Sequence, residues 1–213
     1  MKKPLALFSA LFLLATIPAC ADPRENPVQA VSSSAAEDKT PPSYDMKAQA
    51  LFDMQDLHKK MVSLAQAIPA DKYTWRPGPD VRSISEVFLH LAAANHNIPS
   101  MMTGVTPDAA FKVAGFETST TDKARIIEQL DKSFAYAEAA IQAMSNADFA
   151  RPEKKLGPEA NSGDVIYLLV THAHEHFGQS IAYARVNGVV PPWTLEMQKK
   201  AADAKKDAAP KHD

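Results

Sequence analysis

Four stretches of the chain carry hydrophobic residues at spacings of three and four, the period of an amphipathic α-helix. They predict helices over residues 45–68, 83–102, 122–144 and 162–186. No segment alternates with a period of two for long enough to predict a strand. Four helices of about 20 residues around one core predict an all-α fold, a four-helix bundle. The predicted inward faces are Ala50, Met54, Leu57, Met61, Leu64 and Ile68; Ile84, Val87, Leu91, Ala94 and Ile98; Ile126, Ile127, Leu130, Phe134, Ala137 and Ile141; and Val165, Leu168, Leu169 and Tyr183.

The connections divide the chain into a folded part and polar ends. Ser83 and Glu86 form a capping-box pattern at the start of the second helix. The link over residues 103–121 is too long for a tight turn and is expected to cross the end of the bundle. We expect the bundle to span residues 44–193. A polar charged tail, residues 194–213, has no apolar stripe to bury and is compatible with a frayed helix.

The first 21 residues are expected to be a signal peptide. Lys2 and Lys3 precede an uncharged run of about 13 residues, which is too short to span a bilayer. Cleavage after Ala21 would release a protein into the periplasm or cell envelope, with no transmembrane helix in the mature chain. The alternative is a lipoprotein anchored at Cys20, because residues 17–20 read as a degenerate lipobox. Residues 22–43, rich in Pro, Ser, Ala and charge, are expected to be a flexible linker.

Composition excludes several classes of function. A net charge of −2 does not suit the broad basic face of a nucleic-acid-binding protein, so no nucleic-acid partner is expected. The single cysteine, Cys20, lies at the processing site, which excludes a disulfide framework, a multi-cysteine zinc site and a cysteine nucleophile. The remaining expectation is a small-molecule substrate of unknown identity, with a homodimer possible.

Three of the seven histidines are expected to face the inside of the bundle. His172 and His176 are four residues apart, so they project from adjacent turns of one helix face and can reach one ion. His90 lies within the apolar arc of the second helix. Buried imidazoles are costly unless they are hydrogen-bonded or bind metal. The pattern therefore favours a shared metal site, with hydrogen-bonded core histidines as the alternative.

Other polar residues have both functional and structural interpretations. His58 lies at the edge of the first apolar face and could be a fourth ligand, a partner of a ligand, an acid/base group or a residue of the core rim. Gln179 and Tyr183 share the face of the histidine pair and could orient a ligand; otherwise Gln179 satisfies a backbone group and Tyr183 belongs to the core. The other histidines, expected to be solvated, are His96, His174 and His212.

Four motifs occur along the predicted bundle: Trp75-Arg76-Pro77-Gly78-Pro79, Arg82-Ser83-Ile84-Ser85-Glu86, His90-Leu91 and His172-x-x-x-His176-Phe177-Gly178-Gln179. Taken together, these motifs resemble the DinB/YfiT-like metalloprotein superfamily. The resemblance covers nearly all of residues 44–193 and implies up-down-down-up topology with a long crossover between the second and third helices. It also implies a divalent metal held by His90, His172 and His176. Phe177 departs from the pattern, because family members often carry a basic residue there.

The expected chemistry follows from the number of ligands. Three neutral imidazoles leave a metal position open, where water can be activated or a substrate atom polarised. Zn²⁺ is the first choice, with Ni²⁺ or Fe²⁺ as alternatives. The sequence thus predicts an exported metal-dependent hydrolase or thiol/group transferase, with a pocket shaped by residues 101–116. The alternative is a non-catalytic, stress-associated envelope protein whose metal is structural, which a closed fourth ligand such as His58 would favour.

Overall fold

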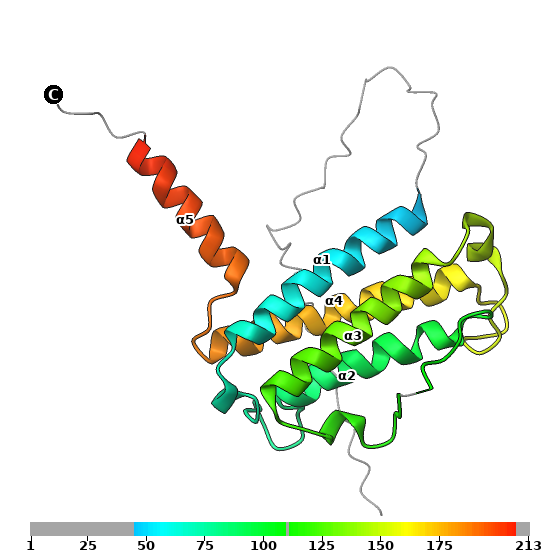
Figure 1. Ribbon diagram of the computed structural model, residues 1–213, viewed down its shortest axis with the longest axis horizontal. Helices are drawn as coiled ribbons and strands as arrows, with labels where there is room; N and C mark the ends of the chain where they lie inside the picture. Colours follow the sequence, from blue (N-terminus) through cyan, green and yellow to red (C-terminus); the bar gives the residue numbers. More distant parts are fainter. Residues whose placement is uncertain (1–44, 110, 208–213) are drawn as a thin grey trace, which may run out of the picture. The chain divides into compact units, whose positions relative to one another are not determined.

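The computed structural model describes residues 45–109 and 111–207. The expected signal peptide and linker lie outside the described residues. The described part is helical, and its extended pairing is limited to one bridge between Pro152 and Asn161. The long helices are α1 (Met46–Ala67), α2 (Ile84–Asn97), α3 (Lys123–Gln142), α4 (Ser162–Val186) and α5 (Pro192–Asp207) (Figure 1). Short 3₁₀ turns are η1 (Ala70–Lys72), η2 (Pro99–Met101), η3 (Phe116–Thr118) and η4 (Asn146–Ala150).

Local chemistry sets the ends of α2. The predicted capping box is present: the Ser83 hydroxyl accepts a hydrogen bond from the Glu86 backbone N–H, and the Glu86 carboxylate accepts one from the Ser83 N–H. The helix ends at Asn97 rather than near residue 102. Pro99 has no N–H to continue the hydrogen-bond ladder, so the chain continues in the 3₁₀ turn η2.

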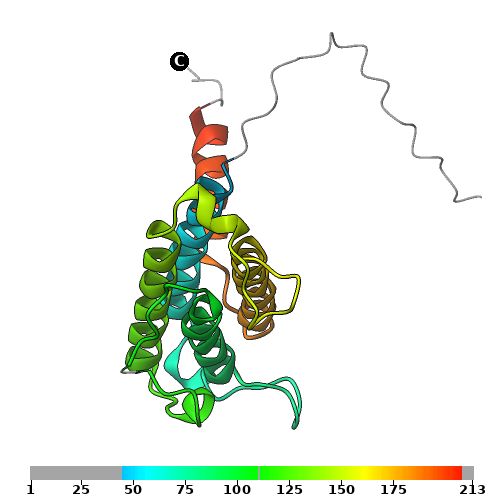
Figure 2. The same ribbon diagram turned by 90° about the vertical axis from the view of Figure 1, so that its right-hand side faces the viewer.

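Helices α1 to α4 form the predicted four-helix bundle. α1 packs against α3 and α4, and α2 packs against the same two helices. α1 and α2 are therefore diagonal neighbours, with α3 and α4 on either side of them (Figure 2). In this arrangement α2 and α4 share one face-to-face interface, and α1 and α3 share the opposite one. The predicted histidine ligands lie on the first pair of helices.

Contacts between helices give the direction of each one. Lys47, at the start of α1, donates to the backbone carbonyl of Gln142 at the end of α3, so these helices are antiparallel. α2 and α3 run in the same direction (Figure 1), and Asn95 of α2 donates to Ser133 of α3 between them. α4 runs in the direction of α1 (Figure 1). The up-down-down-up order with a long crossover between α2 and α3 is confirmed.

The core is built from the predicted apolar faces. Ile127 and Leu168, both expected inside, are only partly buried. Burial of this apolar surface at about 25 cal/mol per Å² is the main term that holds the helices together. All four helices of the bundle contribute large side chains that are less than 2% exposed, and α4 contributes Ile166 and Leu169. The others include Tyr73, Phe88, Phe134, Met54, Leu57, Met61, Leu64, Ile68, Leu89, Leu91 and Ile126.

The crossover connection, residues 98–122, runs back along α2. Side-chain hydrogen bonds and an ion pair hold it near its two ends. At its beginning, the carboxylate of Glu153 accepts hydrogen bonds from the backbone N–H and hydroxyl of Thr103, and it also accepts one from the Ser162 hydroxyl. Glu153 is only 2% exposed. Burial favours its neutral form, but these hydrogen bonds outweigh burial and lower the pKa of Glu153. At the other end, Glu117 pairs with Arg82 at 2.8 Å.

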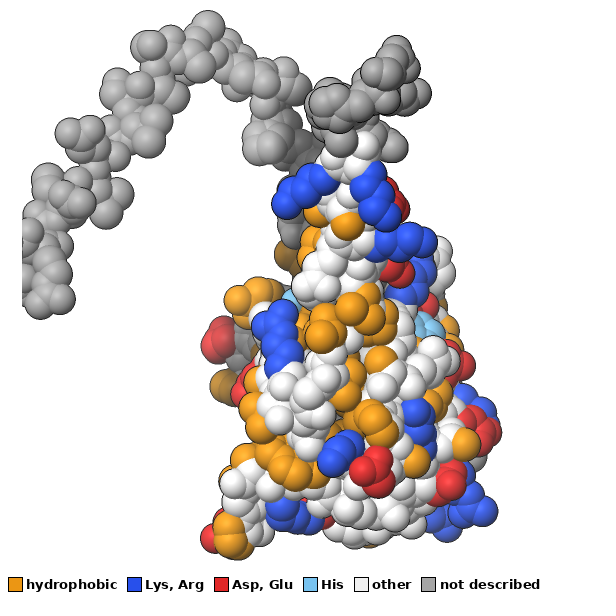
Figure 3. Space-filling view, turned by 90° about the vertical axis from the view of Figure 1, so that its left-hand side faces the viewer, with side chains coloured by type: hydrophobic (Ala, Val, Ile, Leu, Met, Phe, Trp, Pro, Cys, Tyr) orange, Lys and Arg blue, Asp and Glu red, His pale blue; other side chains and the backbone are white. Residues whose placement is uncertain are grey.

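The surface mixes both signs of charge. Lys and Arg side chains are interspersed with acidic and hydrophobic ones over the body of the bundle on the face shown in Figure 3. Lys60 pairs with Asp56, and Lys132 pairs with Glu128, each one helical turn apart. Solvent screens exposed pairs of this kind, so they add little to the stability of the fold.

The expected polar tail contains a helix over most of its described length. α5 begins at Pro192, inside the expected bundle boundary, and continues to Asp207. Its first turn is anchored because the Trp193 ring packs 5.4 Å from the Phe177 ring of α4. Residues 195–206 are exposed. None of the described helices combines the length and the apolar character that a bilayer-spanning segment needs.

Candidate metal centre

The structure brings His90, His172 and His176 together between α2 and α4. Nε2 of His172 lies 3.3 Å from Nε2 of His90 and 3.2 Å from Nε2 of His176. The candidate ligand atoms of all three residues lie within 4.8 Å of one another. His172 and His176 come from successive turns of α4, as their spacing predicts, and His90 meets them because α2 runs alongside. This group is called the histidine cluster below.

Two neighbouring oxygens fix which ring nitrogens carry protons. Nδ1 of His90 donates to a carboxylate oxygen of Glu117 at 2.6 Å, because an ionised carboxylate can only accept. Nδ1 of His176 donates to the side-chain carbonyl oxygen of Gln179 at 2.8 Å. A neutral imidazole has one proton, so Nε2 of His90 and Nε2 of His176 both present lone pairs to the centre of the cluster.

The residues fit a metal ion because the convergent nitrogens cannot satisfy one another. His172 can donate from Nε2 to only one of the two neighbouring lone pairs, and its buried Nδ1 has no hydrogen-bond partner among the described residues. A cation would satisfy all three Nε2 atoms at once. A tetrahedral ion with bonds of about 2.0–2.1 Å to nitrogen separates its ligands by about 3.3–3.4 Å. The observed separations of 3.2 and 3.3 Å match that spacing.

Burial keeps two of the imidazoles neutral, which is the form that binds metal. Burial, with smaller effects from the neighbouring histidines, lowers the pKa of His172 to about 4. Burial also lowers the pKa of His176, although its hydrogen bond to Gln179 acts in the opposite direction. Their lone pairs are therefore available near neutral pH without prior loss of a proton.

Glu117, from turn η3 in the crossover, is the residue of this site that the sequence analysis missed. One carboxylate oxygen accepts from His90, and the other accepts from Nε of Arg82 at 2.8 Å. Partial burial favours the neutral acid, but the hydrogen bonds from Arg82 and His90 outweigh it and lower the pKa of Glu117. Histidine ligands commonly donate to a carboxylate. An acidic residue in the long link was therefore the available signal, although nothing distinguished it from Asp108.

Gln179 and Tyr183 extend the same hydrogen-bond chain. The Gln179 side chain accepts from His176 and donates to the Tyr183 hydroxyl at 3.0 Å, so it holds a cluster residue instead of a backbone group. Tyr183 is buried, and its ring packs edge-on against Trp75 at 5.3 Å. Gln179 thus orients His176, while Tyr183 combines a core position with support of that amide.

His58 does not join the cluster. It lies between α1 and α3, where Nδ1 is 2.9 Å from Glu138 and Nε2 is 2.9 Å from Asp131. Its ring stacks on Phe134 with the centroids 5.0 Å apart and the planes 7° from parallel. Both ring nitrogens are therefore occupied by carboxylates. Among the described residues, no fourth His, Cys, Asp or Glu completes the histidine cluster.

The structure corrects the expectation for His96. This side chain is 7% exposed instead of solvated, and it stacks on Phe111 with the centroids 4.4 Å apart. The crossover covers it, placing Asp108 3.6 Å from its Nδ1. His174 is exposed, as expected, and bonds the backbone carbonyl of Val170. His212 lies outside the described residues.

A pocket of about 220 Å³ opens beside the histidine cluster. It lies between α2 and the crossover, which is where the sequence places the residues expected to shape a substrate site. His90 and His172 form part of its wall, so a molecule in the pocket would contact two of the three cluster residues. Its other lining residues are Ala93, Ala94, Asn97, Ile98, Val113 and Glu117.

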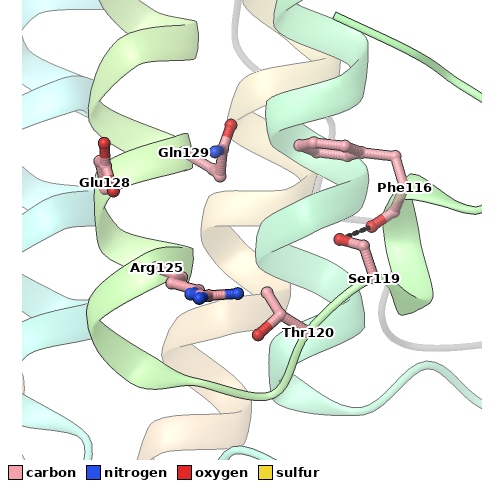
Figure 4. Close-up of a pocket in the computed structure, with 6 residues that line it drawn as sticks. All are labelled: Phe116, Ser119, Thr120, Arg125, Glu128 and Gln129. Carbon is pink, nitrogen blue, oxygen red and sulfur yellow. Dashed lines mark hydrogen bonds between the residues drawn. The ribbon is translucent and has the colours of Figure 1, made fainter.

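A second pocket, of about 320 Å³, lies between the end of the crossover and the start of α3 (Figure 4). Its wall includes Phe116, whose carbonyl accepts from the Ser119 hydroxyl, and the side chain of Arg125 points toward Thr120. No residue of the histidine cluster lines it. The chemistry available to the cluster therefore involves the smaller pocket.

Comparison with known proteins assigns the fold to a family. The family model described as the DinB superfamily matches residues 54–180, a range that contains the histidine cluster, Glu117 and Gln179. The chain belongs to the DinB superfamily. Among solved structures, this DinB-superfamily chain is similar to a DinB-like protein from Bacillus cereus ATCC 10987. The identity is 16% and the TM-score 0.58, with 68% of this chain and 95% of that chain covered, which shows a shared fold. No curated protein matches the chain.

Proposed function

We propose that this protein is a metal-dependent enzyme, a hydrolase or thiol/group transferase acting on a small molecule. The observation that carries the proposal is the meeting of three imidazole Nε2 atoms at the edge of a pocket. Three protein ligands leave a coordination position for substrate or water, which is the arrangement of catalytic sites, whereas structural zinc sites are closed by four protein ligands.

Zinc is the ion that we propose, with Ni²⁺ and Fe²⁺ as the alternatives that metal analysis would reveal. Neutral imidazoles suit all three ions, so ligand type alone does not choose between them. Zinc comes first because three protein ligands with one open position are the arrangement of catalytic zinc sites.

Some residues of the site would bind the metal ion, and others orient the imidazole rings that bind it. His90, His172 and His176 would bind the ion, which supplies Lewis acidity toward an oxygen or sulfur atom of the substrate. Glu117 holds the His90 proton on Nδ1, and Gln179 does the same for His176, so that both rings keep their Nε2 lone pairs directed inward. Glu117 is a positioning residue, since both of its oxygens already have partners.

The alternative is a metal ion with a purely structural role in the bundle. That role would call for a fourth protein ligand. His58 was the candidate for that role, but its nitrogens contact Asp131 and Glu138. A structural ion would also have no need of a pocket at its open side. The geometry therefore favours catalysis over a purely structural metal.

The test compares two histidines of the same helix. Protein purified without a nickel column should contain about one zinc per chain by elemental mass spectrometry. It should turn over a member of a panel of esters, amides, lactones and thiol conjugates. Chelation and His172→Ala should abolish both metal binding and turnover. His174→Ala is the matched control and should change neither, because His174 is exposed and bonds only the backbone.

Each negative result has a distinct meaning. One tightly bound metal per chain without turnover of any substrate class would contradict the enzyme proposal and support the structural alternative. Protein that binds no divalent metal would contradict both and leave hydrogen-bonded core histidines.

We also propose that the protein is exported to the periplasm or cell envelope. The support is the leader pattern of residues 1–21, with anchoring through a lipid on Cys20 as the alternative. Cell fractionation with N-terminal sequencing tests this: a mature chain starting at residue 22 supports soluble export. A lipidated Cys20 would establish the lipoprotein, and an intact Met1 in the cytoplasmic fraction would contradict export.

A further inference from the structure

We infer that the pocket beside the histidine cluster binds a short, uncharged, apolar chain of the substrate, such as the acyl chain of a small ester, amide or thioester. This inference rests on the proposed function, because the metal would hold the polar end of the same molecule. It adds the class of substrate, which neither the fold nor the cluster specifies.

Residues on one face of α2 line the site from the histidine cluster to its far end. His90, Ala93, Ala94, Asn97 and Ile98 are spaced at i, i+3, i+4, i+7 and i+8, so they follow one another along a single side of the helix. At 1.5 Å per residue, Asn97 lies about 10 Å along the axis from His90. A ligand held at the cluster would therefore extend past the two alanine methyl groups toward Asn97.

The wall between these ends favours an apolar chain. Ala93, Ala94, Ile98 and Val113 contribute methyl and methylene groups. No lysine or arginine is among the described residues that line the pocket, and the Glu117 charge is already paired with Arg82. A charged chain would lose hydration here without gaining a partner, whereas each buried CH₂ contributes about 0.8 kcal/mol.

The volume limits the size of that chain. A pocket of 220 Å³ holds about seven waters at about 30 Å³ each, or a ligand of up to about ten non-hydrogen atoms. Drug-sized ligands and nucleotides use pockets of about 300–1,000 Å³. The site therefore suits a chain of about six carbons attached to a reacting group.

Asn97 ends the apolar stretch. Its side-chain amide has no hydrogen-bond partner among the described residues, although its backbone carbonyl accepts from Ser100. A methylene group placed against this amide would displace its water without replacing the hydrogen bonds. Affinity should therefore stop rising where a chain reaches Asn97.

Val113 covers the pocket from the crossover. Its side chain is 55% exposed, and it is not part of the buried core. A substitution at Val113 can change the space available to a ligand without disturbing the packing of the helices. Val190, which is 42% exposed and lies after α4, offers a matched valine away from the pocket.

The experiment measures binding of straight-chain alkyl hydroxamic acids, from acetohydroxamic to decanohydroxamic acid, to zinc-loaded protein by calorimetry. The hydroxamate supplies the metal-binding end, and the tail reports on the pocket. We expect affinity to rise about threefold to fourfold per added CH₂ up to about six carbons and then to level off. Zinc content is measured before and after each titration.

Three variants locate the tail. Val113→Phe should weaken the longer hydroxamates about tenfold and leave acetohydroxamic acid unchanged, while Val113→Ala should reduce the gain in affinity per added CH₂ because part of the apolar wall is lost. Asn97→Leu should prolong the rise, because the polar end of the pocket has become apolar. Val190→Phe should behave like the parent protein.

Failure of this inference can be distinguished from failure of the proposed function. Zinc-loaded protein whose affinity is independent of tail length, or that binds no hydroxamate, overturns the apolar pocket and leaves the metal centre in place. A dependence on tail length that responds to Val113 supports the pocket even if no substrate is turned over. Absence of bound zinc overturns both proposals, since the anchor of the ligand is then missing.

Discussion

Two interfaces of the same bundle hold histidines in opposite chemical settings. Between α1 and α3, His58 has a carboxylate at each ring nitrogen, Glu138 and Asp131, both at 2.9 Å. Between α2 and α4, three imidazoles meet with their Nε2 atoms 3.2 and 3.3 Å apart, and the nearest carboxylate bonds the outer nitrogen of His90.

The difference shows that the neighbours of a histidine decide whether it can bind a metal. At His58 donors and acceptors are already matched, so an ion would have to displace a carboxylate from the ring. At the histidine cluster, acceptors outnumber donors, and a cation is the partner that removes the mismatch. The two settings arise in one fold because α3 presents acids toward α1, whereas α4 presents further histidines toward α2.

The largest effect should come from adding zinc to metal-free protein. At a free zinc concentration of about 100 times Kd, binding stabilises the fold by about 2.7 kcal/mol, which corresponds to a rise in Tm of about 5–10 °C. The rise should be absent in His172→Ala. Differential scanning calorimetry with and without zinc measures it.

In the same calorimetric measurement, we expect His58→Ala to give the opposite pattern to His172→Ala. This variant loses a ring packed on Phe134 and its contacts with two carboxylates, so its Tm should fall in the absence of metal. Its rise on adding zinc should remain as large as in the parent protein. A zinc response lost with His58 would place this residue in the metal site and break the distinction between the two interfaces.

A smaller effect should follow from Glu117→Gln. The amide can still accept from His90, but it lacks the charge that stabilises the Nδ1 proton, so zinc affinity should fall about 10- to 100-fold. Competition with a zinc-binding dye measures the affinity, and the fold is checked by circular dichroism.

Glu128→Gln is the control for that variant, because Glu128 is an exposed carboxylate of α3 paired with Lys132. It should bind zinc like the parent protein. Equal affinities for Glu117→Gln and Glu128→Gln would show that the crossover carboxylate has no part in positioning His90.

The smallest expected effect is a pH dependence of stability. It arises from His96, whose surroundings differ from those of both His58 and the histidine cluster. Burial lowers the pKa of His96 below its ordinary 6.5, although Asp108 acts in the opposite direction, and the aromatic rings of Phe111 and Tyr136 pack against it. Between pH 6.5 and the lower pKa of His96 in the folded chain, the unfolded chain takes up a proton that the folded chain does not. His96 therefore makes stability fall as pH decreases through this range, by at most about 1.4 kcal/mol per pH unit.

Denaturant unfolding between pH 7 and pH 5 measures this dependence. His96→Phe keeps an aromatic ring against Phe111 and should reduce the loss of stability on acidification. The exposed His174→Phe should leave it unchanged. A steeper loss in His96→Phe would mean that the folded chain protonates His96 more readily than the unfolded chain does.

Much of this architecture could be predicted from the sequence because helices are local structures. The apolar period gave the extents of α1, α3 and α4 to within about two residues, and the Ser83–Glu86 capping box located the start of α2. The shared face of His172 and His176 follows from helix geometry alone.

Sequence reasoning failed where a distant segment decides the surroundings. His96 was expected to be solvated because its chain neighbours are Asn95 and Asn97, yet adjacent residues of a helix point in different directions. The crossover then covers His96 with Phe111. Glu117 was missed for the same reason: it bonds a residue 27 positions earlier, and a loop has no periodicity that would reveal the contact.

The sequence by itself determined four amphipathic helices and the pair of histidines on one face of the last, since backbone hydrogen bonds between residues four apart fix which side chains share a face. Only the tertiary structure decided that His90 completes the cluster, that His58 has carboxylate partners, and that Val113 lines a pocket beside the cluster. These relations depend on distances between segments far apart in the chain. Burial of the core sets those distances, and the hydrogen bonds of Glu153 and Glu117 fix the path of the crossover.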